Sequence, residues 1–173
     1  MARAARIDLR TFQQELAARL ATKTAAQVES SRLGLSCAGE RWLVRLGDAG
    51  EVVAMPPIVT VPMTKPWFLG VANIRGNLYS VVDFAAFLGA EPVAPNPQTR
   101  LVLFSARAGE LNAGLVVQRV VGLRNVSELA PVSALADARE WYGQRWMDGD
   151  GNAWQEIDLA KLARSQAFLH VGV

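Results

Sequence analysis

The acidic residues best spaced for metal chemistry lie in the segment 148–152, Asp-Gly-Asp-Gly-Asn. The first and third positions match the start of a calcium-binding loop, where carboxylates bind the ion. The sixth position is Ala153 instead of glycine, and the twelfth is Leu159 instead of a bidentate glutamate. Asp-Gly pairs are also common in hairpin turns. We therefore expect a turn between two strands here and no metal site.

The only cysteine and the only histidine offer a candidate nucleophile and a candidate base. Cys37 lies in an alternating apolar segment, where we expect a buried structural thiol, because reactive thiols need exposed, electropositive surroundings. His170 lies close to the C-terminus, where chains are often poorly ordered. One Cys and one His cannot supply a zinc site, and no glycine-rich phosphate motif occurs. The sequence predicts no catalytic residue and no cofactor; a hydrolase would need a pocket with perturbed titrating groups.

Aromatic and basic side chains gather between residues 139 and 154, a combination that can bind single-stranded nucleic acid by stacking. They are Trp141, Tyr142, Trp146, Trp154, Arg139 and Arg145. Acidic residues that would repel phosphates are interspersed with them: Glu140, Asp148, Asp150, Glu156 and Asp158. Trp-rich strands more often form a small core or a protein interface. We therefore expect no nucleic-acid partner.

The composition is that of one ordinary folded domain or one domain of two lobes. Of 173 residues, 51% are hydrophobic and 20% charged, and the net charge of +2 does not indicate a nucleic-acid binder. A single cysteine excludes an intrachain disulfide. No apolar run of about 18 residues occurs, and no apolar signal segment follows the N-terminal arginines. We expect a cytoplasmic protein without direct membrane insertion.

Residues 8–21 have the pattern of an amphipathic helix. Leu9, Phe12, Leu16 and Leu20 recur at spacings of three and four, and Asp8 is a plausible N-cap. The simpler expectation is that this helix packs on the outside of the domain. The alternative is that it docks on a partner. Residues 21–32 are expected to be helix tail or linker.

Most of the remaining chain alternates between short β-strands and turns. Three hairpins are predicted, at 33–37 with 41–45, at 100–105 with 111–117, and at 140–147 with 153–157. Residues 120–124 continue the β character, whereas 46–53 could form a helical turn or a loop. The three prolines within 90–99 indicate a crossover or a lobe boundary.

The segment 61–89 contains a strand, a tight turn, a second strand and a short capped helix. Residues 67–72 and 78–82 form the strands, and the turn lies within 73–77, where Gly and Asn tolerate positive φ. Asp83 is the expected N-cap and Gly89 the C-terminal stop. Residues 157–163 repeat the order of strand end, Asp and short apolar helix found at 82–88. This repetition favours two lobes of short antiparallel strands.

The segment 70–77, Gly-Val-Ala-Asn-Ile-Arg-Gly-Asn, followed by Val-Val-Asp at 81–83 and Leu-Gly at 88–89, closely resembles the signature of CheW-like domains. Residues 100–123 resemble the family's second-lobe segment, except that Gln118 stands where the family commonly has Asp. The resemblance implies a mainly β fold of two five-stranded SH3-like barrels with short helices.

The resemblance covers most of the chain and gives its expected organisation. Residues 1–32 would be an N-terminal helix and linker, 33–165 the CheW-like domain with a break near 90–99, and 166–173 a C-terminal tail. The N-terminal helix and the ending at 167–169 are similar to those of adaptors in chemosensory systems that control type IV pili and twitching motility.

The resemblance also implies a function without chemistry. CheW-like domains are adaptors that join the cytoplasmic tip of a chemoreceptor to the regulatory domain of a CheA-type histidine kinase, at membrane-associated arrays. The alternative is a freestanding SH3-like module that binds other proteins. The partner-binding residues implied are Val71, Asn73, Ile74, Arg75, Gly76 and Asn77. Gly70, Asp83 and Gly89 would be structural, and Val71, Ile74 and Leu78 could belong either to the core or to a groove.

Overall fold

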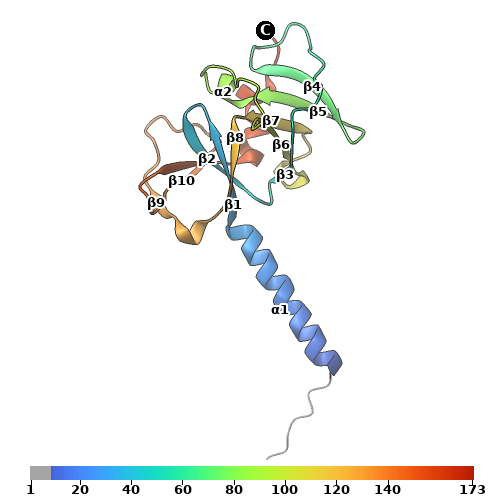
Figure 1. The fold of residues 1–173 in the computed structure, drawn as a ribbon, viewed down its shortest axis with the longest axis vertical. Coiled ribbons are helices and arrows are strands. Elements are labelled where there is room, and N and C mark those ends of the chain that lie inside the picture. Colours follow the sequence, from blue (N-terminus) through green and yellow to red (C-terminus); the bar gives the residue numbers. More distant parts are fainter. Residues whose placement is uncertain (1–8) are drawn as a thin grey trace, which may run out of the picture.

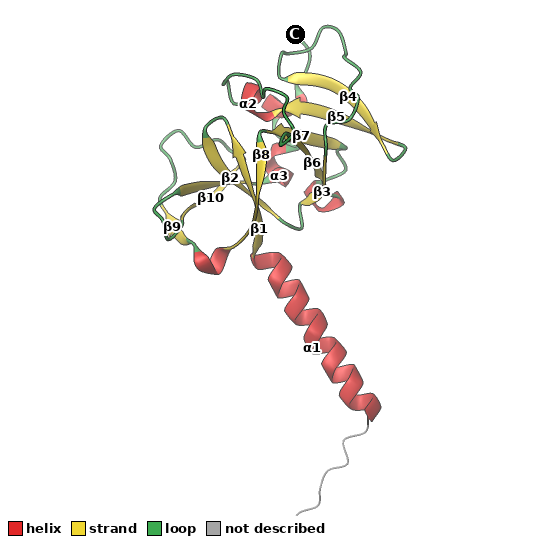
Figure 2. Cartoon of the chain, viewed as in Figure 1, coloured by secondary structure: helices red, strands yellow, loops and turns green. Residues whose placement is uncertain are grey.

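The computed structural model describes residues 9–173, which form two β-sheets, several short helices and one long N-terminal helix (Figures 1 and 2). The expected mainly β fold is confirmed. The proposed cap Asp8 lies outside the described residues. Within them, no helix combines the length and hydrophobicity needed to cross a bilayer.

The first sheet has six strands in the order β8-β1-β2-β11-β10-β9. They are β1 (Ser31–Cys37), β2 (Glu40–Arg45), β8 (Arg119–Asn125), β9 (Ala130–Val132), β10 (Tyr142–Met147) and β11 (Ala153–Ile157). The expected hairpins β1–β2 and β10–β11 are confirmed. The two hairpins join through parallel pairing of β2 with β11. Strands from both ends of the described chain therefore form one sheet.

The second sheet has five strands in the order β3-β6-β7-β5-β4. They are β3 (Ala49–Val53), β4 (Phe68–Ile74), β5 (Asn77–Asp83), β6 (Arg100–Phe104) and β7 (Ala113–Val117). The antiparallel pairs β4–β5 and β6–β7 join through parallel pairing of β5 with β7. Strand β3 forms where the sequence left a helical turn or a loop, because its backbone pairs with β6.

The expectation of two five-stranded barrels is correct only in part. The strands do divide into two sheets, but one of them has six strands, and the strand order of each sheet is open. Nor is the break at residues 90–99 a boundary between the sheets. This segment follows β5 and precedes β6, and both strands belong to the five-stranded sheet. It is a crossover.

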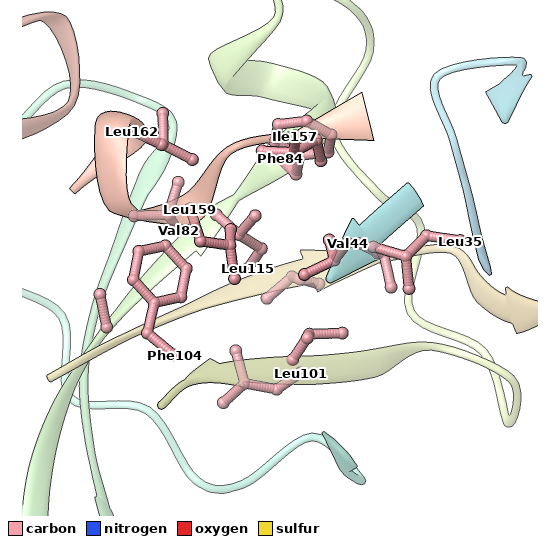
Figure 3. Packing of buried hydrophobic residues seen from close by; sticks show 14 of the residues in the cluster. Leu35, Val44, Val82, Phe84, Leu101, Phe104, Leu115, Ile157, Leu159 and Leu162 are labelled. Carbon is pink, nitrogen blue, oxygen red and sulfur yellow. The ribbon is translucent and has the colours of Figure 1, made fainter. Parts of the chain in front are cut away.

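One hydrophobic core joins the two sheets. Leu35 and Val44 from the first sheet, and Leu101 and Leu115 from the second, contribute to this core of buried side chains (Figure 3). Phe84 from helix α2 (Phe84–Phe87) is fully buried in the same cluster. Burying such side chains supplies most of the driving force for folding, so the two sheets form one packing unit.

The internal repetition seen in the sequence is real. Asp83 caps α2 by accepting from the backbone N–H of Ala86 at 3.0 Å, and Asp158 caps α3 (Leu159–Leu162) by accepting from Lys161 at 3.0 Å. Each Asp also donates its own N–H to a tryptophan carbonyl, that of Trp67 and that of Trp141 respectively. In each sheet, one strand therefore passes into a short helix through the same hydrogen-bonded junction.

Helix α1 (Leu9–Ser30) projects away from the sheets instead of packing on them (Figure 1). None of its side chains is buried, and the stripe of Leu9, Phe12, Leu16 and Leu20 is 46–67% exposed. The expectation that this helix packs on the outside of the domain is therefore wrong. Of the two alternatives for residues 21–32, helix tail is correct for residues 21–30, because the helix continues to Ser30 and β1 begins at Ser31.

Residues 166–173 are not a free tail. Helix α4 (Gln166–Leu169) begins at Ser165, whose hydroxyl accepts from the N–H of Phe168. Phe168 is 3% exposed and packs in the core. The residues after it pair with the loop before β4, since Lys65 donates its N–H to the carbonyl of Val171 at 2.8 Å. The C-terminus is part of the domain.

Candidate partner-binding site

The hairpin between β4 and β5 presents Arg75 at its tip. Ile74 pairs with Asn77, so Arg75 and Gly76 form a two-residue turn. Both have positive φ, 52° and 85°, as a type I′ turn requires. The side-chain oxygen of Asn73 accepts from the N–H of Gly76 at 2.9 Å and closes the turn. The sequence therefore fixes the backbone that carries Arg75.

Arg75 is exposed but not free. Its Nη2 lies 2.6 Å from Oε1 of Glu51. Glu51 is on β3, which is one edge strand of the five-stranded sheet, whereas β4 is the other. The Arg75 side chain is 76% exposed, so most of its donors face solvent. Glu51 was missed in the sequence, because the residues around it gave no strand pattern that would bring it near the hairpin. The ion pair holds the guanidinium at a defined place above the sheet.

The predicted site residues divide between the surface and the sheet interior. Asn73, Gly76 and Asn77 are exposed together with Arg75, whereas Val71 and Ile74 are half-buried. Ile74 packs against the core. Leu78 is 61% exposed, so of the two alternatives, core or groove, the core is excluded for this residue. The hairpin thus brings the predicted residues together but turns Leu78 outward.

Exposed apolar side chains lie in the segment that precedes β4. Val59 is 68% and Met63 76% exposed, and both lie in the segment between β3 and β4. Val59 also forms a backbone bridge with Val71, which attaches this segment to the outer edge of β4. Contiguous exposed apolar groups are common on protein-interaction surfaces, so this edge of the sheet is a further candidate contact.

Gly70, Asp83 and Gly89 have structural places. A β-carbon on Gly70, whose φ is 134°, would overlap the carbonyl oxygen of Val59. Asp83 is 2% exposed, and its second oxygen accepts from the N–H of Val93 at 2.8 Å, which fastens the crossover to α2. Gly89 has a φ of 88° just after α2. These three residues therefore support the hairpin and the helix that follows it.

The acidic segment at 148–152 forms the expected hairpin turn. Asp148 accepts from the N–H groups of Asp150 and Asn152 and from the indole N–H of Trp154 at 2.9 Å. These hydrogen bonds, that from Trp154 foremost, hold the pKa of Asp148 well below its usual range. Among residues 9–173 no cluster of three potential metal ligands is found. The carboxylate is used to close the turn.

Cys37 is fully buried, and burial raises the pKa of its thiol to about 12. We expect a disulfide reagent at pH 8 to leave the folded protein unlabelled, since only ~10⁻⁴ of the thiol would be ionised. Urea should expose Cys37 and allow stoichiometric labelling. Rapid labelling without urea would contradict the burial.

Because the folded-state pKa of Cys37 is raised, the free energy of unfolding should fall as the pH rises above about 9.

Comparisons with known proteins agree with this architecture. The family model described as CheW-like domain matches residues 32–167. The chain is 30% identical to protein PilI of Pseudomonas aeruginosa over 176 aligned residues, which cover 96% of this chain and 94% of that protein. It is 28% identical to protein FrzA of Myxococcus xanthus, over 66% of this chain and 73% of FrzA.

The structural comparison concerns the fold alone. The crystal structure of the scaffolding protein TtCheW from Thermoanaerobacter tengcongensis superposes with a TM-score of 0.67 at 20% sequence identity, covering 80% of this chain and 95% of that chain. The family model spans both sheets and the Arg75 hairpin, and PilI aligns over almost the whole chain. The chain belongs to the CheW-like domain family.

Proposed function

We propose that this protein is a non-catalytic adaptor that couples a chemoreceptor to a CheA-type histidine kinase in a chemosensory system controlling type IV pili. The observation that carries the proposal is the Arg75 hairpin, an exposed guanidinium on a fixed turn within a CheW-like domain. The similarity to PilI over 96% of the chain supports the pilus branch of the family. The proposed location is the cytoplasmic face of a membrane-associated array.

Such an adaptor needs separate surfaces on one rigid body. The two sheets, acting as the two SH3-like lobes, share one core, so a displacement at one sheet is transmitted to the other. In the proposed complex, the kinase's regulatory domain binds one lobe and the receptor's helical hairpin docks between the lobes. Arg75 would offer planar donors to carboxylates or helix-end carbonyls of the receptor.

The first test is titration calorimetry against the regulatory domain of a CheA-type kinase from the same genome. Binding at micromolar concentration or tighter, in both the unmodified protein and Arg75→Ala, is the expected result. This result would establish kinase binding and would assign Arg75 to the contact with the receptor. Absence of binding at high concentration would favour a freestanding interaction module.

Arg75→Ala is expected to weaken co-sedimentation with receptor-containing membranes about tenfold, because charge-assisted hydrogen bonds to the receptor are lost. Its free energy of unfolding should change by less than about 0.5 kcal/mol, since the residue is exposed. The matched control is Glu51→Gln, which removes the ion pair but keeps the guanidinium, and it should retain receptor binding. A thermal midpoint several degrees lower in Arg75→Ala would instead indicate a structural role.

A further inference from the structure

A second basic surface lies on the six-stranded sheet, away from the Arg75 hairpin. It is a hollow of about 420 Å³ between β8, the inner strand β2 and the turn at 148–152. We call it the arginine hollow; its basic members are Arg41, Arg119 and Arg124. Figure 1 shows β8 and β2 in the part of the molecule remote from the tip of the β4–β5 hairpin. The two surfaces are therefore separate.

Strand register brings the arginines together. Ser36 on β1 pairs with Arg41 on one side and with Arg119 on the other. Directly paired residues point to the same face of a sheet. Arg124, further along β8, pairs with Arg32 and so belongs to the same face. Three strands thus place these side chains on one surface.

Trp154 positions two of the three guanidinium groups. The guanidinium carbon of Arg124 lies 5.2 Å from the centre of the indole ring, and that of Arg41 lies 6.0 Å away. Trp154 itself is 2% exposed and is fixed by its hydrogen bond to Asp148. Cation–π contact uses the face of a guanidinium and leaves its N–H edge available. The N–H groups of these two arginines therefore remain able to donate to an acceptor.

Within residues 9–173, none of these three arginines forms an ion pair or a side-chain hydrogen bond. The contrast is with Arg32 and Arg45 on neighbouring strands, which both form ion pairs with Glu156. Arginines on the edge strand β8 also discourage pairing with another sheet. That explanation does not apply to Arg41, because β2 lies inside the sheet. The unpaired charges point to an external anion.

The hollow is also lined by three acidic residues, Glu128, Asp148 and Asp150. The oxygens of Asp148 already accept from the turn and from Trp154. Asp150 and Glu128 are exposed and remain available to repel an anion on their side. A polyphosphate backbone would meet this repulsion, and the buried Trp154 offers no face for base stacking. A short segment with a few carboxylates can contact the arginines without placing a continuous line of negative charge beside Asp150 and Glu128.

We propose that the arginine hollow binds a carboxylate-rich segment of a partner protein. The surface is additional to the receptor and kinase contacts proposed above. Two guanidinium groups are pre-positioned by Trp154, which lowers the entropy lost on binding. Because the hollow is open and wet, the interaction should be weak, salt-sensitive and dependent on each arginine.

The test is titration calorimetry at low salt, in which a hexaglutamate peptide is added to the full chain. Hexaglutamine is the uncharged control peptide. Arg119→Gln and Arg124→Gln should each weaken hexaglutamate binding about fivefold. Asp150→Asn should strengthen it, because one repulsive charge is removed. Arg164→Gln is the matched control, since this exposed arginine follows α3 and lines a different hollow.

Equal weakening by Arg164→Gln and Arg119→Gln would overturn the proposal, because binding would then reflect net charge. Absence of hexaglutamate binding, or equal binding of hexaglutamine, would also overturn it. Citrate or inorganic phosphate that binds as tightly as the peptide would assign the hollow to a small anion instead. Strengthening by Asp150→Asn cannot result from a folding defect, and it therefore separates a charge effect from a damaged fold.

Discussion

Phe168→Ala is expected to lower the free energy of unfolding by about 4 kcal/mol, because truncating a buried Phe removes its transfer free energy and leaves a cavity. Phe168 lies parallel to Phe104, with ring centres 5.8 Å apart, and parallel to Trp67 at 6.3 Å. Its edge contacts Phe87 at 5.5 Å. One side chain near the C-terminus therefore connects the five-stranded sheet to α2. Urea denaturation measures the loss.

Leu169→Ala is the matched control for Phe168→Ala. Leu169 is the next residue in α4 and is 50% exposed, so its truncation should cost less than about 1 kcal/mol. Similar losses in the two variants would mean that α4 is stabilised as a unit instead of through Phe168. An unchanged urea midpoint in Phe168→Ala would show that the C-terminal segment does not contribute to the core.

Glu156→Gln should destabilise the protein by about 3 kcal/mol. The Glu156 side chain is 3% exposed, and its Oε1 lies 3.0 Å from Nε of Arg45 and 3.2 Å from Nε of Arg32. Arg32 is also buried, and its Nε makes no aligned hydrogen bond, so the carboxylate charge is its main compensation there. Removing one member of a buried ion pair leaves an uncompensated charge. Thermal and urea denaturation at pH 7 measure the effect.

Glu29→Gln is the corresponding control on the surface. It removes the ion pair with Arg107, in which the side chains are 64% and 58% exposed. Exposed pairs contribute little to stability, so the urea midpoint should stay almost unchanged. If Glu156→Gln costs as little as Glu29→Gln, water must reach Arg32 in solution. The comparison isolates burial, since both variants remove one carboxylate charge.

Local chemistry made much of the fold predictable. Two-residue periodicity marked the hairpins, and Asp83 and Asp158 identified the helix starts because a carboxylate satisfies free N–H groups there. The Arg-Gly turn followed from the conformational freedom of glycine and from Asn73. These features depend on residues close in sequence, which is why the candidate hairpin was identified correctly.

Features that depend on distant residues were not predictable in this way. Glu51 meets Arg75 only because β3 and the β4–β5 hairpin belong to one sheet. Phe168 follows a short segment without strong periodicity, so it gave no sign of reaching the core. The apolar stripe on α1 suggested packing, yet none of its side chains is buried. Periodicity shows which side of a helix is apolar but not what covers it.

The order of the strands has a consequence for synthesis on the ribosome. The five-stranded sheet is formed entirely from residues 49–117, so all its strands are synthesised before residues 118–173. Strand β2 must wait for β11, because Leu43 pairs with Glu156. Until β11 emerges, the β2 edge of the nascent β1–β2 hairpin is unpaired, and unpaired strand edges are prone to aggregation. Emergence of β11, not of the first two strands, therefore sets when this edge is protected.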